Sequence, residues 1–525
     1  MASRWAYCGK IVATSAPVTG VPRALGVLLL VASFAAAFAL YTREAGMPFY
    51  YHSDEPSKVE QVIGIRRLNF KHPLLLMNAT RALASATGAL DRQGAVRAGR
   101  TVSAAFAAGT VTALAALAWL MGGLLAAACV APLVLLSHGL FTYAHFMKED
   151  TAVSVGFACV LLAASAFAQR PRAGAAAALG AACAVALSGK YVGAAALLGA
   201  LPLLALKARE AAGWGGRNFA AFAGGLLAVL AVVNVSALLD PAGFRAGLAY
   251  ETDHVATGGG RPFAGLLSPS YFLGFASQTT WPVRVLALGF LAFVLASWRR
   301  RSFAERALAL FPLLYLALLQ GSQIKAIRYL LPAVVVVHAL AGLAVAGLAA
   351  RLGGASPLRR AGVAALLLVP VVAVQGRVVA AHLGEFAAES RSTLYAWVRD
   401  HVPPESVIVQ DRYAGLPDPS ELYTTPDQPY LPQLVVTRHY AVDQGTLEEL
   451  RSAGVEYVAV CERITERFFG DPRRFGSDDA RARFERRRAR YAELFEKGTL
   501  VFEAGSSRIA GAPVNPVVRL YRIAP

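Results

Sequence analysis

The sequence has 525 residues, of which 56% are hydrophobic and 16% charged, and its mean hydropathy is +0.48. Long apolar runs separated by short basic connectors fill most of the chain, which excludes an ordinary soluble protein and indicates a membrane protein. The formal net charge of +18 does not indicate nucleic-acid binding, because the arginines cluster between apolar runs and do not line one aromatic-rich surface.

About eleven apolar runs are long enough to cross a bilayer as helices. The first, at 22–41, is followed by further runs, so we expect a retained helix and not a cleaved signal peptide. The others lie near 99–119, 122–140, 151–168, 173–188, 191–206, 218–239, 282–298, 304–320, 329–350 and 361–378. The tight junctions at 119/122 and 188/191 leave a total of about ten to thirteen open.

Alternate connectors are basic, which by the positive-inside rule places them and the N-terminus in the cytoplasm. These connectors hold Arg170, Arg172, Lys207, Arg209, Arg217, Arg299, Arg300, Arg301, Arg306, Arg351, Arg359 and Arg360. The external side then receives the first loop at 42–98, the segment 148–150, the loop 240–280, the segment 321–328 and the C-terminal tail.

The composition becomes charged and mixed near residue 380, so we expect a membrane domain at 1–379 and a small soluble α/β domain at 380–525. Helices are predicted at 386–401, 446–454 and 477–497, and strands at 406–410, 455–461, 499–504 and 517–523. This domain has no GxGxxG motif and no phosphate-binding loop, so the sequence assigns it no chemistry of its own.

The first external loop contains an acidic pair, Asp54-Glu55, after aromatic residues and before an amphipathic stretch. Apolar residues between Val59 and Leu68 can share one face of a helix on the membrane surface, which would hold Asp54 near the bilayer interface. Asp54 with the following Pro56 also fits the cap of a surface helix. The spacing therefore leaves a capping role and a chemical role both open.

A second acidic pair, Glu149-Asp150, begins the fourth predicted helix on the same external side as Asp54. Such residues can mark or cap a helix end, so the pair alone is not decisive. Lys190 and Arg328 place cations on the external side against the general charge bias. They can snorkel to the interface, or they can hold a lipid phosphate.

The glycine-rich external loop at 240–280 contains Asp253, His254 and Arg261. It is either a simple connector or a mobile lid whose polar side chains contact substrate. The five cysteines show no metal-ligand spacing, so the sequence implies neither a zinc site nor a disulfide framework.

Together these features resemble the dolichyl-phosphate-mannose protein mannosyltransferase family and its bacterial relatives, such as the aminoarabinose transferase of lipid A. The resemblance covers essentially the whole chain and depends on four ordered motifs: Asp54-Glu55 with His72-Pro73, Lys148-Glu149-Asp150, Gly189-Lys190-Tyr191, and Arg328-Tyr329-Leu330-Leu331-Pro332. The segment SRSTLYAWVRDHVPPESVIV is also similar to the entry into the external domain of bacterial members. A single proline follows His72 where relatives often have two, and the β-trefoil insertion of the eukaryotic enzymes is absent.

The resemblance implies a polytopic α-helical membrane protein of the C-type glycosyltransferase (GT-C) fold. It implies that sugar is transferred from a polyprenyl phosphate to an acceptor hydroxyl with inversion, Asp54 acting as general base and Glu55 beside it. Lys190 and Arg328 would hold the donor phosphate. Glu149 and Asp150 would orient the acceptor or the Asp54 loop, or hold a divalent cation, although no metal is required. Further expected substrate contacts are His72, Tyr191, His254, Arg261 and Tyr329.

The resemblance also implies a location in the bacterial inner (plasma) membrane, with the active site and the C-terminal domain outside the cytoplasm. The expected partners are a polyprenyl-phosphate-linked sugar, membrane lipids, and an acceptor that is a lipid, a glycan or a protein. The missing β-trefoil argues against a eukaryotic-type protein acceptor. The identities of the sugar and the acceptor stay open.

Two other classes of protein fit a polytopic chain. A transporter or lipid flippase usually places ionisable residues at mid-membrane and often has paired halves, whereas the charges here gather at external helix ends. A catalytically silent scaffold that carries the external domain is the third class. Sugar transfer by the purified protein would separate the three.

Overall fold

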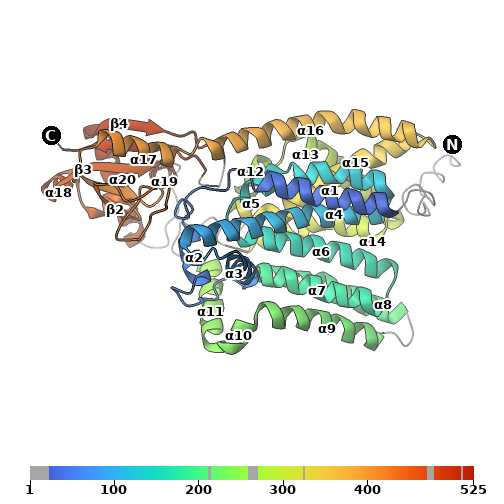
Figure 1. Cartoon of the computed structure of the whole chain (residues 1–525). Helices are drawn as coiled ribbons and strands as arrows, with labels where there is room; N and C mark the ends of the chain where they lie inside the picture. The colour runs from blue at the N-terminus through green and yellow to red at the C-terminus, as the bar shows by residue number, and fades with distance from the viewer. Residues whose placement is uncertain are drawn as a thin grey trace.

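The computed structural model describes residues 23–210, 215–257, 270–322, 326–469, 478–509, 512 and 514–524. A bundle of long helices forms most of it, and a small α/β domain lies at one end of the bundle (Figure 1). The long helices are α1 (Arg23–Tyr41), α4 (Arg92–Leu135), α6 (Glu149–Gln169), α7 (Ala173–Gly189), α8 (Ala196–Glu210), α9 (Gly215–Val233), α13 (Trp281–Ala296), α14 (Phe303–Gln320), α15 (Leu331–Leu352) and α16 (Pro357–Ala387).

Each predicted apolar run coincides with one of these helices, and two runs fall on successive parts of α4. Within the described residues, eight helices are long and apolar enough to cross a membrane. The number is nine if α12 (Ser270–Ser277) and α13, which meet at a bend of 117°, together form one span. The apolar helix α7 is not counted, because it has fewer than 18 residues. The chain is therefore a multi-pass membrane protein.

The long helix α4 consists of two arms that run in opposite directions. Gly26, near the start of α1, lies directly against the ring of Trp119. Tyr41, the last residue of α1, donates a hydrogen bond of 2.8 Å to the carbonyl of Leu135. Arg100, near the start of α4, donates to the carbonyls of Ala45 and Met47, just after the Tyr41 end of α1. The first arm therefore runs from the Tyr41 end to the Gly26 end, and the chain turns back between Trp119 and Leu135. It does so at Gly122-Gly123, where Gly123 has φ 72° and ψ −164°, a backbone conformation open essentially to glycine alone.

Short helices cover the end of the bundle that faces the α/β domain. These are α2 (Glu55–Val62), α3 (Leu75–Thr87), α5 (His138–Ala144), α10 (Val235–Leu239), α11 (Pro241–Thr257), α12, and the 3₁₀ turns Tyr191–Ala195 and Ile327–Leu330. Arg301 and Arg351, from two of the basic connectors, both lie over the ring of Phe293. The turn that joins α15 to α16, which follows Arg351, lies at the opposite end of the bundle (Figure 1). The 3₁₀ turn Trp298–Arg300 directly precedes Arg301 in the connector between α13 and α14.

Two expectations for the external segments were wrong in detail. The predicted amphipathic helix ends at Val62, and Gly64 with φ 84° turns the chain away, so α2 is a short helix buried on nearly all sides and not a surface helix. The predicted loop 240–280 is largely helical, and α11 runs across the direction of the bundle helices (Figure 1). Arg261 and its glycine-rich neighbours lie outside the described residues.

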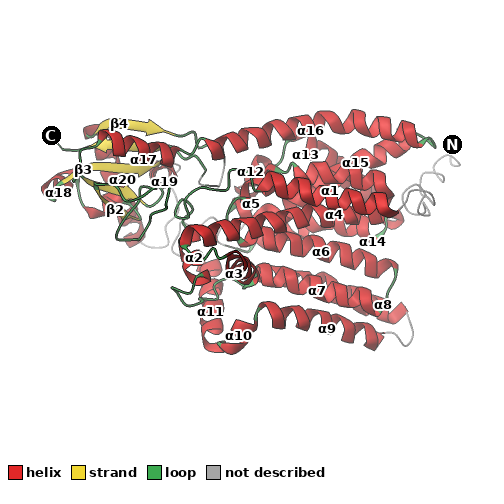
Figure 2. Ribbon diagram, in the orientation of Figure 1, coloured by secondary structure: helices red, strands yellow, loops and turns green. Residues whose placement is uncertain are grey.

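The C-terminal domain is a five-stranded sheet with helices on both faces (Figure 2). Its strands are β1 (Val407–Asp411), β2 (Leu434–Arg438), β3 (Val455–Cys461), β4 (Thr499–Ala504) and β5 (Val518–Arg522), in the order β2-β1-β3-β5-β4. Strand β1 is parallel to β2 and β3, whereas β5 pairs antiparallel with β3 and β4. The helices are α17 (Ser390–His401), α18 (Leu447–Ser452), α19 (Glu462–Phe469), α20 (Asp478–Lys497) and the 3₁₀ turn Ala441–Gln444.

Alternation along β1 supplies the two hydrophobic cores of this domain. Ile408 packs in the core that contains Leu394 of α17, whereas Val409 packs in the core that contains Leu450 and Tyr491 of α18 and α20. The predicted helices and strands are found close to their expected positions. The helix expected at 386–401 is two helices, because α16 continues to Ala387 and α17 begins at Ser390.

Candidate active site

Asp54 lies where the first loop meets the start of α6, at the end of the bundle next to the C-terminal domain. It occupies the N-cap position of α2, but its side chain makes no capping hydrogen bond. Its Oδ2 atom instead lies 2.5 Å from Nζ of Lys148 and 3.9 Å from a guanidinium nitrogen of Arg328. The side chain is 41% exposed. The carboxylate is therefore free of a capping role, held by cations and open to solvent.

The adjacent Glu55 is placed very differently. Its side chain is fully buried, and its two oxygens accept from Nε and Nη2 of Arg100 at 3.0 and 2.6 Å. The backbone N–H of Met147 donates to the same carboxylate at 2.8 Å. Glu55 thus joins α2 to α4 and to the chain entering α6, and both of its oxygens are occupied.

The second acidic pair lies beside Asp54 and is also paired with cations. Glu149 forms an ion pair of 2.5 Å with Lys58 of α2, whose ammonium group also donates to the carbonyl of Met147. Asp150 lies 2.9 Å from Nζ of Lys190 and 3.7 Å from Nε of Arg328. Asp54 and Asp150 thus belong to one polar cluster, because Arg328 lies within ion-pair distance of both.

Lys190 and Arg328 both point into this cluster. Nζ of Lys190 lies 3.9 Å above the ring of Tyr329, and the Arg328 guanidinium lies 5.3 Å from the same ring. Arg328 is too far from Asp54 and Asp150 for hydrogen bonds, and its buried Nε has no hydrogen-bond partner among the described residues. A buried polar atom without a partner is costly, so this guanidinium is suited to an anionic ligand.

The connected ion pairs leave this cluster with one excess positive charge. Three cations, Lys148, Lys190 and Arg328, surround two carboxylates, Asp54 and Asp150. The neighbouring pair of Lys58 and Glu149 is neutral as a unit. Among these ion-paired residues the cations therefore outnumber the carboxylates by one, and the carboxyl group of Glu251, on α11, is the further acidic group that acts on Lys190.

The electrostatic field of the cluster keeps Asp54 ionised. Lys148 is the main cause that holds the pKa of Asp54 well below its usual range, and Arg328 and Lys58 act in the same direction. Burial lowers the pKa of His52, so this imidazole is neutral at pH 7. Its Nδ1 accepts the backbone N–H of Asp54 at 3.2 Å and its ring packs on Phe146 at 4.7 Å.

The other predicted contact residues have different neighbours in the structure. His72 is near Glu149 and Lys58, its pKa is lowered to about 4 by burial, and its Nδ1 has no hydrogen-bond partner among the described residues. The Tyr191 hydroxyl donates to the carbonyl of Phe70 at 2.7 Å, so it helps to hold the first loop.

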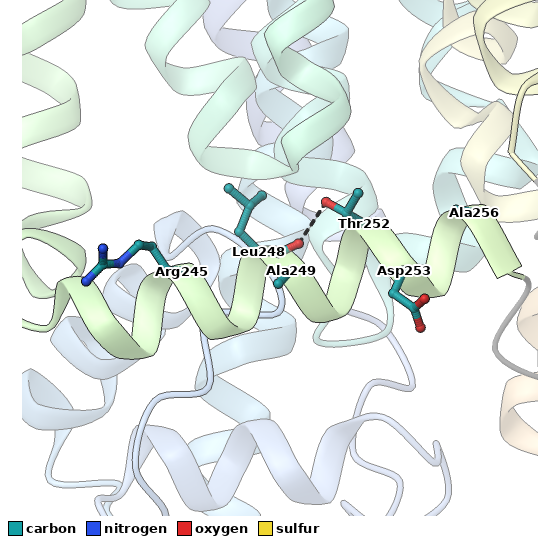
Figure 3. A pocket seen from close by; sticks show the side chains of 6 residues that line it. All are labelled: Arg245, Leu248, Ala249, Thr252, Asp253 and Ala256. Carbon is teal, nitrogen blue, oxygen red and sulfur yellow. Dashed lines mark hydrogen bonds between the residues drawn. The ribbon is translucent and has the colours of Figure 1, made fainter.

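His254 lies on α11, where its ring stacks on Tyr250 at 5.7 Å. The same helix borders a cavity of about 610 Å³. The side chains that line it come from α11 alone: Arg245, Leu248, Ala249, Thr252, Asp253 and Ala256 (Figure 3). None of them belongs to the ion-pair cluster around Asp54, and it is Glu251 on the same helix that acts electrostatically on Lys190 and Glu149.

Sequence reasoning missed Lys58, His52 and Arg100, and it quoted Lys148 only as part of a motif. Lys58 follows Asp54 by four residues in α2, a spacing that places both on one side of a helix. This spacing was the available signal for Lys58. The burial of His52 and the pairing of Arg100 with Glu55 depend on packing between distant segments, for which the sequence gives no local signal.

No protein-family model and no curated protein matches this sequence. Solved structures do match. The crystal structure of ArnT from Cupriavidus metallidurans bound to undecaprenyl phosphate is 16% identical, with a TM-score of 0.55, over 95% of this chain and 98% of that chain. Its apo state is 17% identical over 94% and 97%, again with a TM-score of 0.55.

The chain has the C-type glycosyltransferase fold. Because the likeness to ArnT extends over nearly the full length of both chains, it includes the α/β domain as well as the bundle. The archaeal oligosaccharyltransferase AglB from Archaeoglobus fulgidus, in complex with an inhibitory peptide and a dolichol-phosphate, is 10% identical with a TM-score of 0.50. That match covers 93% of this GT-C chain and 74% of AglB.

Proposed function

We propose that this protein is an integral membrane glycosyltransferase that moves a sugar from a polyprenyl phosphate to an acceptor hydroxyl, with inversion. The observation that carries the proposal is the position of Asp54. An ionised, partly exposed carboxylate lies beside a group of cations with one excess positive charge. A base for the acceptor and a site for the donor phosphate are therefore adjacent. The ArnT and AglB structures, which hold lipid phosphates, lend support through the shared fold.

In the proposed reaction the acceptor oxygen attacks the anomeric carbon of the sugar from the face opposite the phosphate. The acceptor proton passes to the Asp54 carboxylate as the new C–O bond forms. The bond between the anomeric carbon and the phosphate oxygen breaks, and the lipid leaves as a polyprenyl phosphate with one more negative charge. This single displacement inverts the anomeric centre.

Arg328 and Lys190 are the residues we assign to the donor phosphate. The negative charge on the phosphate increases as the sugar leaves, so cations near it stabilise the transition state more than the ground state. Arg328 is favoured as the direct contact because its Nε makes no hydrogen bond among the described residues, with Asp150 only at ion-pair distance, and because its side chain is 28% exposed. Lys190 lies further inside, where Asp150 and the Tyr329 ring fix its position.

We assign the remaining carboxylates to the architecture of the site. Glu55 anchors the loop through Arg100 and is not expected to take a proton, because both of its oxygens are already hydrogen-bonded. Glu149 and Asp150 hold Lys58 and Lys190 in place. A divalent cation could replace one of these ammonium groups only by breaking an ion pair that the structure contains.

The test is sugar transfer by the purified protein in liposomes, with polyprenyl-phosphate-linked sugars as donors and mass spectrometry of the products. Transfer by the wild type and its loss in Asp54→Asn are expected. Movement of labelled lipid across the bilayer without any transferred sugar would favour a flippase and contradict the proposal. Comparison of envelope glycans with and without the gene identifies the acceptor.

The proposal places the site and the α/β domain outside the cytoplasm of a bacterial cell. Both lie at the end of the bundle opposite the connectors that carry Arg301 and Arg351. Because basic connectors face the cytoplasm, the Asp54 end faces away from it.

A further inference from the structure

We propose that the α/β domain takes part in the reaction itself, by positioning the Asp54 carboxylate through a chain of hydrogen bonds from Tyr413 to Ser53 to Asp54. This inference rests on the proposed function, because it assigns Tyr413 and Ser53 as positioning residues for the proposed base. The sequence showed no chemistry in this domain. The contacts between the α/β domain and the first loop indicate that this domain positions the segment that leads into Asp54.

The aromatic segment before Asp54 is buried against the α/β domain. Phe49, Tyr50 and Tyr51 are each at most 3% exposed. The Tyr50 ring stacks on Tyr423, with centroids 5.4 Å apart and planes within 3°. The hydroxyls of Tyr50 and Tyr51 lie 2.8 and 3.2 Å from Oε1 of Gln428. Buried aromatic contacts with hydrogen-bonded hydroxyls hold a segment in one conformation.

Two arginines of the same region hold the backbone on either side of His52. Nη1 of Arg391 donates to the Tyr51 carbonyl at 2.5 Å, and its guanidinium lies 4.2 Å from the centre of the Tyr51 ring. Nη2 of Arg412 donates to the Ser53 carbonyl at 3.2 Å. The peptide groups that lead into Asp54 are thus fixed by residues that lie more than 330 positions later in the chain.

The side chain of Ser53 connects the α/β domain to the carboxylate. Its Oγ lies 2.7 Å from the hydroxyl oxygen of Tyr413 and 3.3 Å from Oδ1 of Asp54. An ionised carboxylate can only accept, so Ser53 must donate its single proton to Asp54. Tyr413 must then donate to Ser53. The direction of the chain is fixed by the charge of Asp54.

This chain and Lys148 hold the two oxygens of Asp54 from opposite sides. Lys148, at the start of α6 in the membrane domain, binds Oδ2, whereas Ser53 binds Oδ1. The carboxylate is therefore restrained about the bond that joins it to Cβ. A base that is restrained close to its working geometry reacts faster than one that rotates freely. The Ser53 contact is longer than an ideal O–H···O bond, so its contribution is modest.

The experiment compares Tyr413→Phe, Ser53→Ala and the double variant with wild type in the liposome transfer assay. Each single change removes one hydroxyl, and we expect kcat to fall about 3- to 10-fold with the KM for the donor unchanged. Because Tyr413 acts only through Ser53, the double variant should be no slower than Ser53→Ala. Tyr395→Phe is the matched control, since its hydroxyl donates within the α/β domain, to the Pro429 carbonyl.

A kcat for Tyr413→Phe within twofold of Tyr395→Phe would overturn the inference while leaving the proposed function intact. The inference would also be overturned if the fold-decrease in kcat of the double variant equalled the product of the fold-decreases of the two single variants. Hydrogen–deuterium exchange gives a second readout that needs no activity. The backbone amides of residues 53–55, 57 and 58 should exchange faster in Tyr413→Phe than in Tyr395→Phe. If the wild type transfers no sugar, the proposed function fails, and equal exchange in the two variants would then overturn the positioning role separately.

Discussion

Two adjacent carboxyl groups, Asp54 and Glu55, should respond to nearly isosteric substitution in opposite ways. Asp54→Asn removes a partly exposed carboxylate that makes no capping bond, but it also removes the counter-charge of Lys148, whose side chain is 3% exposed. The amide oxygen can still accept from that ammonium group, so we expect the free energy of unfolding to fall by about 1–3 kcal/mol. The amide cannot take the acceptor proton. Loss of a general base slows turnover by about 10²- to 10⁴-fold, which corresponds to about 2.7–5.5 kcal/mol of activation free energy.

Glu55→Gln should destabilise the protein more than Asp54→Asn does, because both members of its ion pair are buried. Arg100 is 1% exposed and donates two hydrogen bonds to Glu55, and the Met147 N–H donates a third. Neutralising Glu55 leaves a buried guanidinium without its counter-charge, which costs about 3–5 kcal/mol. Molecules that remain folded still contain Asp54. Their turnover per folded molecule should fall much less than in Asp54→Asn.

The assay measures thermal unfolding in detergent and initial rates of transfer in liposomes at matched amounts of folded protein. Expression and unfolding separate the two variants before any rate is compared. An Asp54→Asn protein with near-wild-type turnover would refute the assignment of the base. A Glu55→Gln protein as stable as wild type would show that the buried ion pair with Arg100 does not stabilise the fold.

Three further predictions concern the donor, the pH dependence and the topology. Arg328→Ala and Lys190→Ala should raise the KM for the donor or lower kcat while leaving the KM for the acceptor unchanged, and steady-state kinetics with each substrate varied would test this. Because Lys148 holds the pKa of Asp54 below its usual range, Asp54 stays ionised above pH 5, and the rate should show no acidic limb from it between pH 5 and 8. Lys148→Met should raise that pKa and move such a limb toward neutral pH, as pH–rate profiles of kcat/KM would reveal. A phosphatase reporter fused to the C-terminus should be active in cells, whereas an inactive fusion with cytoplasmic labelling of Cys461 would contradict the proposed sidedness.

The sequence predicted the membrane helices and most of the α/β domain because these depend on local patterns. Apolar length defines the helices, and short runs rich in β-branched residues, each following a helix end, define the buried strands β1 and β3. Strand β2 escaped prediction since it lies at the edge of the sheet and exposes Leu434 and Arg438, so its burial pattern is weak. The reversal inside α4 was indicated only by the short gap between two runs.

The candidate site was predicted in part. Asp54, Glu149, Asp150, Lys190 and Arg328 were singled out from motifs, and the structure brings them together. The distinct role of Glu55 could not be predicted, because its partner Arg100 lies 45 residues away on another helix. The contacts between the first loop and the α/β domain join residues more than 330 positions apart, and no periodicity carries such information.

The glycine reversal in α4 has a consequence for how the chain is assembled in the membrane. With no loop between them, the two arms of α4 have to enter the bilayer together as a hairpin. If a substitution at Gly123 straightened the helix, the chain would make one traverse fewer, and every later segment would emerge on the wrong face. Lys148 would then be separated from Asp54 by the whole membrane, although its own helix was unchanged. Gly122 and Gly123 thus determine on which side of the membrane every later segment lies.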